Sequence, residues 1–182
     1  QPVADDDDLT WCIGPPLLGS FERMLGDRQR AETALAHYRE RFGAIGLYEN
    51  AVYPGIRETL ESLTDAGHHL FVATSKPWIY AERIIEHFAL TSRFEAIFGA
   101  ELDGTRADKT DLLAWVLDRA SLDPTSTTMI GDRSHDIIGG RGNGMATVGV
   151  LYGYGTTKEL TSAGADWLCE TPADLLPTLN AR

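Results

Sequence analysis

The feature that most constrains the fold is an alternation of short apolar segments with amphipathic segments. Apolar runs of strand length occur at 69–74, 94–100, 127–132, 145–151 and 165–170. Stretches with helical spacing separate them, such as the one through Leu112, Leu113, Val116 and Leu117. Strands that alternate with helices are typical of parallel sheets covered by helices. The sequence therefore predicts an α/β fold with a doubly wound, Rossmann-like parallel sheet.

The N-terminal quarter of the chain has a different pattern. Apolar residues recur at helical spacing in 17–25, after the breaker Pro15-Pro16, and again in 31–45. The acidic run 5–8 reads as a solvated turn that caps a helix. We therefore expect a small helical unit over residues 1–47 and an α/β core over residues 48–182.

The composition excludes some classes of partner and indicates the cellular compartment. The formal net charge is −11, which argues against nucleic acid and anionic membranes as main partners. No apolar run reaches the roughly 18 residues of a membrane span. The cysteines, Cys12 and Cys169, lie far apart and form no disulfide framework, which fits a reducing cytosol. We expect a cytoplasmic protein that acts on a small molecule; the sequence does not indicate an oligomeric state.

Polar residues follow the strand-like segments, at the edge where ligands bind in such sheets. One strand ends in Thr74-Ser75-Lys76, another in Gly131-Asp132 with Asp136 four residues later, and Lys109 begins a helix between them. A hydroxyl and a lysine can hold a phosphoryl group, and aspartates are ligands for Mg²⁺. Taken singly, each residue could instead be a helix cap, a turn residue or an exposed lysine. Their meeting at one edge favours a phosphate site.

These residues resemble the motifs of the haloacid dehalogenase superfamily, closest to its phosphoglycolate phosphatase and 5′-nucleotidase-like branch. "LFVATSKP" resembles the second motif, "DGTRADKTDLL" contains the lysine of the third, and "MIGDRSHD" resembles the fourth. The resemblance implies that Thr74 and the neighbouring Ser75 bind the phosphoryl group and that Lys109 steadies it. It makes Asp132 a Mg²⁺ ligand, and Asp136 a second acid that assists the metal or orients Lys109. Residues before about 48 would be a helical cap.

The family's first motif, an apolar strand followed by Asp-x-Asp-Gly-Thr, does not occur in the sequence. In the family its first aspartate attacks phosphorus, and the strand is central, between those that end at Thr74 and Asp132. The similar stretch Glu101–Thr105 follows Thr74 in the chain and has glutamate at the first position, so we interpret Asp103 as a turn residue and Asp108 as a helix cap. We expect a fragment that lacks its central strand and is inactive as it stands.

The resemblance implies a Mg²⁺-dependent phosphomonoester phosphatase that acts on a small phosphorylated metabolite through an aspartyl-phosphate. Three alternatives stay open. One is a non-catalytic module that binds phosphate or metal. Another is a receiver-like domain, although the order of Thr74, Lys109 and Asp132 along the chain differs from that class. The third is a different activity on the same fold: 5′-nucleotidase, pyrophosphatase, phosphomutase or dehalogenase.

Overall fold

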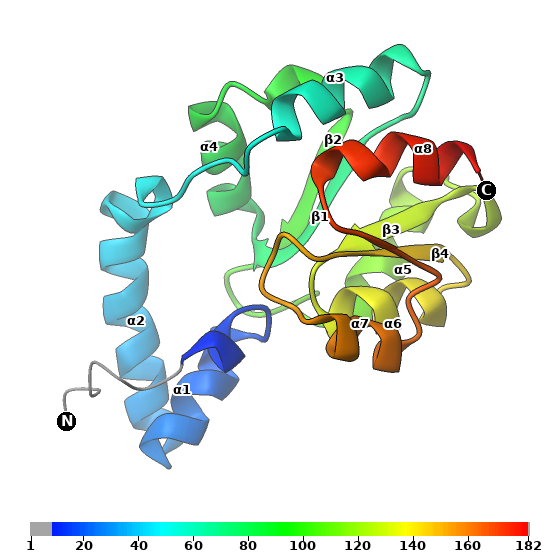
Figure 1. Ribbon diagram of the computed structural model, residues 1–182. Helices are drawn as coiled ribbons and strands as arrows, with labels where there is room; N and C mark the ends of the chain where they lie inside the picture. Colours follow the sequence, from blue (N-terminus) through cyan, green and yellow to red (C-terminus); the bar gives the residue numbers. More distant parts are fainter. Residues whose placement is uncertain (1–8, 182) are drawn as a thin grey trace.

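The computed structural model describes residues 9–181. Its α-helices are α1 (Leu17–Leu25), α2 (Arg28–Ala44), α3 (Ile56–Asp65), α4 (Trp78–His87), α5 (Lys109–Arg119), α6 (Ser134–Gly142), α7 (Thr157–Ala163) and α8 (Leu175–Asn180) (Figure 1). Its strands are β1 (Phe71–Pro77), β2 (Ala96–Ala100), β3 (Thr128–Gly131), β4 (Ala146–Val150) and β5 (Trp167–Cys169). Among the helices of this described part, none is long and apolar enough to cross a membrane.

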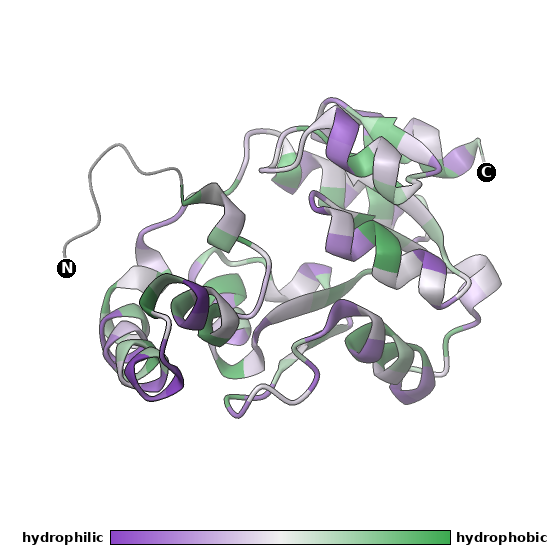
Figure 2. Cartoon of the chain, turned by 90° about the horizontal axis from the view of Figure 1, so that it is seen from below, coloured by the Kyte–Doolittle hydropathy of each residue, from purple (hydrophilic) through white to green (hydrophobic). Residues whose placement is uncertain are grey.

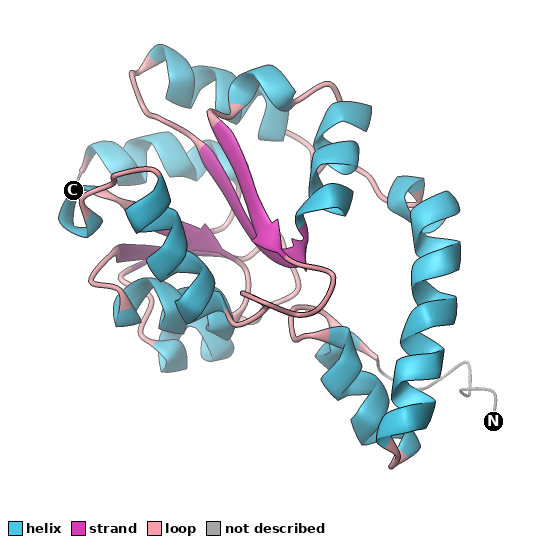
Figure 3. Cartoon of the chain, turned by 180° about the vertical axis from the view of Figure 1, so that it is seen from behind, coloured by secondary structure: helices cyan, strands magenta, loops and turns pink. Residues whose placement is uncertain are grey.

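The strands form two parallel sheets. β1 pairs with β2, and β4 lies between β3 and β5. Within residues 9–181, no backbone pairing joins β1 to β3. Figure 3 shows the β1–β2 pair running apart from the other strands, with helices around both sheets. The α/β class with parallel strands is confirmed, and the strand that ends near Thr74 is not bonded to the strand before Asp132, as the sequence predicted.

Side chains of α5 connect the two sheets. Helix α5 packs against β1 and β2 and also against α6. Its residue Leu113 is buried in a cluster with Met129 of β3 and Met145, and Ala73 of β1 packs against the same cluster. Burial of apolar side chains is the main favourable term in folding. Within the described chain, apolar packing under α5 therefore holds the sheets together where strand pairing does not.

A second core lies under β4 and β5. Val148 and Val150 of β4 are buried against Cys169 of β5 and Leu175 of α8. Thr147, which precedes Val148 in β4, is fully buried, and the Asp166 carboxylate accepts from its backbone N–H and from its hydroxyl, each at 2.8 Å. The C-terminal helix is thereby anchored to the three-stranded sheet.

Helices α1 and α2 form a hairpin beside the sheets. Gly26 ends α1 in the left-handed region (φ 65°), and Asp27 caps α2 by accepting from the backbone N–H of Arg30 at 2.8 Å. Figure 2 shows this hairpin set to one side of the strand-containing body. A ring contact joins it to the core: the centroids of Phe42 on α2 and Tyr80 on α4 lie 5.4 Å apart. The domain boundary at residue 47 stays a prediction.

Several local expectations are refined by the structure. A proline such as Pro77 is expected in the first turn of a helix, but β1 runs to Pro77, which is the N-cap of α4. The spacing of Thr156 and Glu159 predicts a capping box at the start of α7. Half of it forms: Thr156 accepts from the backbone N–H of Glu159, whereas the Glu159 carboxylate accepts from Arg133 and Ser134 instead. Charge-assisted bonds are the stronger ones. The acidic run 5–8 lies outside the described residues.

Candidate active site

A large cleft lies between the hairpin and the carboxyl ends of the strands. Its volume is about 1370 Å³. The predicted site residues all line this cleft: Thr74, Ser75, Lys109, Asp132 and Asp136. The opposite wall comes from the N-terminal turn and the hairpin and includes Ile13, Pro16, Tyr38 and Phe42. The structure therefore brings together residues that lie far apart in sequence, at the edge where α/β proteins bind ligands.

Lys109 and Asp136 form a nearly buried ion pair in this cleft. The Nζ of Lys109 lies 2.9 Å from Oδ1 of Asp136, and the two side chains are 10% and 12% exposed. The same ammonium donates to the backbone carbonyl of Ala73 on β1 at 3.0 Å. Asp108 caps α5 with its carboxylate, as the sequence predicted, and so fixes the helix at the residue before Lys109. The lysine is thus held by a carbonyl of β1 and by a carboxylate of α6.

The second carboxylate oxygen of Asp136 also accepts a hydrogen bond. Its Oδ2 accepts from the backbone N–H of Arg133 at 3.2 Å, which closes the first turn of α6. Gly131 leaves room for this carboxylate, because a Cβ there would lie 2.3 Å from the Asp136 Cβ. Of the two roles implied for Asp136, the geometry favours orienting Lys109. Its role as a metal ligand stays a prediction.

Asp132 is enclosed by a glycine-containing loop after β4. Its Oδ2 accepts from the backbone N–H of Tyr154 at 2.8 Å. A Cβ at Gly153 would lie 2.4 Å from the Asp132 side chain, and one at Gly155 would lie 1.9 Å from its carbonyl oxygen. Only glycine allows this close approach. The loop therefore orients the Asp132 carboxylate, whose Oδ1 has no hydrogen-bond partner among the described residues.

Mg²⁺ usually binds proteins through one or two carboxylates, with waters and substrate phosphate completing the octahedron. Asp132 fits that requirement, with one oxygen free at the cleft. Within residues 9–181, no group of three or more histidine, cysteine or acidic side chains could hold an ion without further ligands. A metal at this edge would therefore depend on water and phosphate oxygens.

Thr74 lies where β1 leaves its regular pairing. The register shifts between Thr74 and Pro77, and the Thr74 hydroxyl accepts from the backbone N–H of Lys76 at 3.1 Å. Gly99 on β2 lies opposite, and a Cβ there would be 2.6 Å from the Lys76 carbonyl. The irregular strand end presents the Thr74–Lys76 segment to the cleft. This is the kind of local disruption that re-aims side chains next to functional sites.

Lys76 lies at the same strand end, but its residue type and position alone predict no role in the site. Its ammonium lies 4.5 Å from the centroid of the Phe42 ring on α2, an attractive cation–π geometry. Burial lowers the pKa of the Lys76 ammonium. Its position next to Thr74-Ser75 was the only signal in the sequence. The contact with Phe42, from a helix more than thirty residues away, could not be read from it.

Two tyrosines flank Asp132. The rings of Tyr53 and Tyr152 meet edge to face with centroids 5.7 Å apart. Burial, and to a lesser extent the nearby Cys169 and Asp132, raises the pKa of Tyr152 to about 12. Tyr152 is therefore a neutral hydroxyl at physiological pH. Both residues line the cleft.

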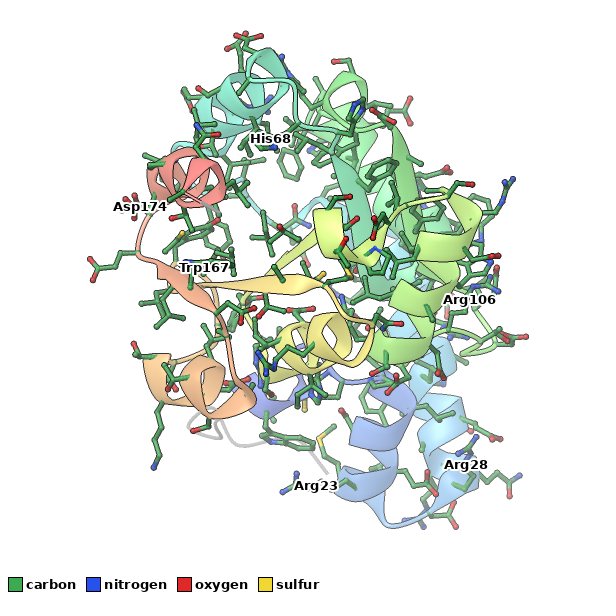
Figure 4. The ribbon with its side chains drawn as sticks, turned by 90° about the vertical axis from the view of Figure 1, so that its right-hand side faces the viewer. Arg23, Arg28, His68, Arg106, Trp167 and Asp174 are labelled. Atoms are coloured by element: carbon green, nitrogen blue, oxygen red, sulfur yellow. The ribbon has the colours of Figure 1, made fainter. Side chains whose placement is uncertain are left out.

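The loop before Lys109 is built as a turn. The Asp103 carboxylate accepts from the backbone N–H of Thr105 at 2.8 Å, as expected for a turn residue. Arg106, labelled in Figure 4, lies 4.2 Å above the Trp115 ring and pairs with Glu101. These contacts fasten the loop to α5. Asp103 also lines the cleft, but it is an exposed turn residue whose Oδ1 accepts from Thr105, so the geometry does not favour it as a nucleophile.

The haloacid dehalogenase-like hydrolase family model matches residues 2–150. The chain belongs to this family. It is 48% identical over 174 residues to a 5′-nucleotidase of Pseudomonas aeruginosa, covering 95% of this chain and 79% of that protein. It is 41% identical over 154 residues to the tyrosine-protein kinase PtkA of Mycobacterium tuberculosis, covering 85% of this chain and 53% of PtkA. Phosphoglycolate phosphatases are also among the relatives, at 26% identity in Vibrio vulnificus.

Solved structures of haloacid dehalogenase-like proteins have the same architecture. A predicted phosphatase from Clostridium acetobutylicum superposes with a TM-score of 0.94 at 39% identity, over 99% of this chain and 84% of that one. The family resemblance drawn from the sequence motifs is therefore confirmed. The family model and the relatives show membership of a hydrolase family, and the solved structure shows the same α/β architecture.

Proposed function

We propose that this haloacid dehalogenase-like protein is a Mg²⁺-dependent phosphomonoester phosphatase of the phosphoglycolate phosphatase or 5′-nucleotidase type. The observation that carries the proposal is the convergence of Thr74, Lys109 and Asp132 on one cleft at the strand ends. Relatives named 5′-nucleotidase and phosphoglycolate phosphatase support the same reaction class. The substrate would be a small phosphorylated metabolite, handled in the cytoplasm.

In this proposal the transferring phosphoryl group lies between the end of β1 and Lys109. The Thr74 hydroxyl and the backbone N–H of Ser75 donate to phosphoryl oxygens, and the Lys109 ammonium neutralises their charge. Phosphoryl transfer depends mainly on such positioning and electrostatic stabilisation. Asp136 acts as a positioning residue, because its carboxylate lies 2.9 Å from Nζ of Lys109.

Asp132 would hold the Mg²⁺, with Asp136 as a second acid nearby. The ion supplies charge neutralisation for the phosphate oxygens when it is bound. The glycine loop 153–155 keeps the Asp132 carboxylate turned toward the cleft. Tyr53 and Tyr152 line the cleft on that side.

The proposed reaction passes through an aspartyl-phosphate. An aspartate carboxylate attacks phosphorus, the alcohol leaves with a proton from a second acid, and water then releases phosphate. Asp103 does not suit the first role, because it is an exposed turn residue whose Oδ1 accepts from the backbone N–H of Thr105. We assign the attacking aspartate to an Asp-x-Asp-Gly-Thr segment outside residues 1–182, which on their own would bind but not hydrolyse the ester. Residues 1–47 would act as the cap over the core, 48–182.

Hydrolysis of p-nitrophenyl phosphate with and without Mg²⁺ tests this function. We expect turnover when the chain is extended by its upstream coding sequence, and at least a hundredfold less for residues 1–182 alone or for Asp132→Asn in the extended chain. Turnover by residues 1–182 that Asp103→Asn abolishes would overturn the assignment of the nucleophile. If the extended chain binds Mg²⁺ and phosphate without turnover, the non-catalytic binding module is the correct function instead.

A further inference from the structure

Among the lysines and arginines that line the cleft in the described chain, one side-chain charge has no polar partner. Five lysines and arginines line it: Arg28, Arg39, Lys76, Lys109 and Arg133. Arg28 pairs with Glu22 and Glu32, Lys109 with Asp136, and Arg133 with Glu159. Arg39 donates to the Leu102 carbonyl. Within the described chain, only the Lys76 ammonium among them has neither an ion pair nor a hydrogen bond.

Keeping the Lys76 ammonium charged and unpaired in the cleft is energetically unfavourable. Burial lowers the pKa of Lys76, which means that the folded protein disfavours its charged form. The ring of Phe42 lies 4.5 Å from Nζ and compensates only in part. A half-buried cation without a counter-ion is the arrangement expected when an anionic ligand completes the pair.

The position of Lys76 separates it from the proposed phosphoryl site. Lys109 reaches down to the Ala73 carbonyl and to Asp136 on the core side. Lys76, at the irregular end of the same strand β1, reaches to Phe42 on the hairpin helix α2. A substrate with its phosphoryl group at Lys109 would place the rest of its structure toward the hairpin. The two lysines therefore face different parts of one bound molecule.

We propose that Lys76 is a specificity-determining residue that binds a second anionic group, a carboxylate or a phosphate, on the leaving alcohol of the substrate. This inference rests on the proposed phosphatase function and narrows its substrate class to doubly anionic phosphomonoesters. Phe42, stacked on Tyr38 with centroids 5.2 Å apart, forms the wall against which the Lys76 side chain is held. A neutral leaving group would leave the lysine without its counter-ion.

The test compares two phosphate esters of similar size. 2-Phosphoglycolate carries a terminal carboxylate where ethyl phosphate carries a methyl group. Dissociation constants for both are measured by calorimetry with Mg²⁺, on residues 1–182 and on Lys76→Met, which keeps the side-chain length without the charge. Lys158→Met is the matched control, because Lys158 is the exposed member of the three lysines in the chain.

We expect Lys76→Met to raise the dissociation constant of 2-phosphoglycolate by about tenfold or more and to change that of ethyl phosphate by less than about twofold. The reason is that a charged hydrogen bond is lost for the first ester alone. Lys76→Arg should retain part of the preference, and Lys158→Met should change neither constant. Circular dichroism and a melting curve check that each variant folds.

Three other outcomes would each overturn the proposal, and the measurements distinguish them. An equal loss for both esters would place Lys76 on the transferring phosphoryl group and overturn the proposal. No loss for either ester would make the contact with Phe42 purely structural and overturn it as well. If wild-type protein binds neither ester, the proposed function fails, and this inference fails with it.

Discussion

The ammonium of Lys109 and the carboxylate of Asp136 lie 2.9 Å apart with little solvent around either. Asp136→Asn keeps the shape and the hydrogen bond from Arg133 but leaves Lys109 as an uncompensated charge. Removing one partner of a buried ion pair costs about 3–5 kcal/mol. We expect a decrease of that size in the free energy of unfolding, measured by urea denaturation.

The control for this prediction is an exposed ion pair. Arg28 and Glu32 also lie 2.9 Å apart, but their side chains are 59% and 57% exposed. Glu32→Gln should cost at most about 0.5 kcal/mol, because water screens the charges. Equal costs for the two substitutions would show that Lys109 and Asp136 are not buried as described.

Gly155 allows the loop after β4 to approach Asp132. In Gly155→Ala the new Cβ would lie 1.9 Å from the Asp132 carbonyl oxygen, so the backbone has to move. We expect a loss of about 3 kcal/mol, at the upper end of what overpacking costs. Urea denaturation measures it, and weaker Mg²⁺ binding should accompany it because the loop orients the Asp132 carboxylate.

Gly19→Ala is the matched control for that substitution. Gly19 lies inside α1, and a Cβ there would meet no atom within 4 Å. Alanine favours helix over glycine by about 0.8–1.0 kcal/mol, so this variant should be more stable than wild type. The interpretation of the loop would be wrong if both substitutions shifted stability in the same direction.

Tyr152 should ionise late in an alkaline titration. Its pKa is raised to about 12, so between about pH 10 and 12 the unfolded state would lose this proton before the folded state does. The folded protein therefore loses stability across that window. Ultraviolet difference spectra should show a phenolate step near pH 12 that Tyr152→Phe removes; a step of the same size in the variant would contradict the burial of Tyr152.

Lys76→Met should stabilise the protein while it weakens anion binding. Burial lowers the pKa of Lys76, so from that pKa up to the ordinary value near 10.4 the unfolded state binds more protons and wild-type stability rises with pH. The advantage of Lys76→Met should thus be greatest at neutral pH and shrink as the pH rises. Melting curves of wild type, Lys76→Met and Lys158→Met at several pH values test this; a destabilised Lys76→Met at neutral pH would contradict it.

The residues of the site could be predicted because parallel strands all end at one edge. Thr74 and Asp132 follow apolar runs, and Asp108 precedes a helical pattern, so their placement depends on local sequence and on the sheet alone. Glu159 shows where such reasoning stops. The spacing from Thr156 predicts a capping box, but Arg133 and the backbone of Ser134 compete for the carboxylate.

The role of Lys76 was missed for a related reason. What distinguishes this lysine is that Phe42 from the hairpin lies beside it and that no counter-ion does within residues 9–181; both depend on how the hairpin sits over the strands. Similarly, the sequence allowed two roles for Asp136. Only the distance to Lys109 shows which partner its Oδ1 has.

Lys109 is the first residue of α5, and Leu113, one turn along the same helix, lies in the core that holds the two sheets together. The position of the Lys109 ammonium and the packing between the two sheets therefore depend on the same helix, α5. A substitution that leaves a cavity at Leu113 would shift α5 and displace the Lys109 ammonium. Phosphate affinity would therefore decrease under conditions in which the protein is still folded.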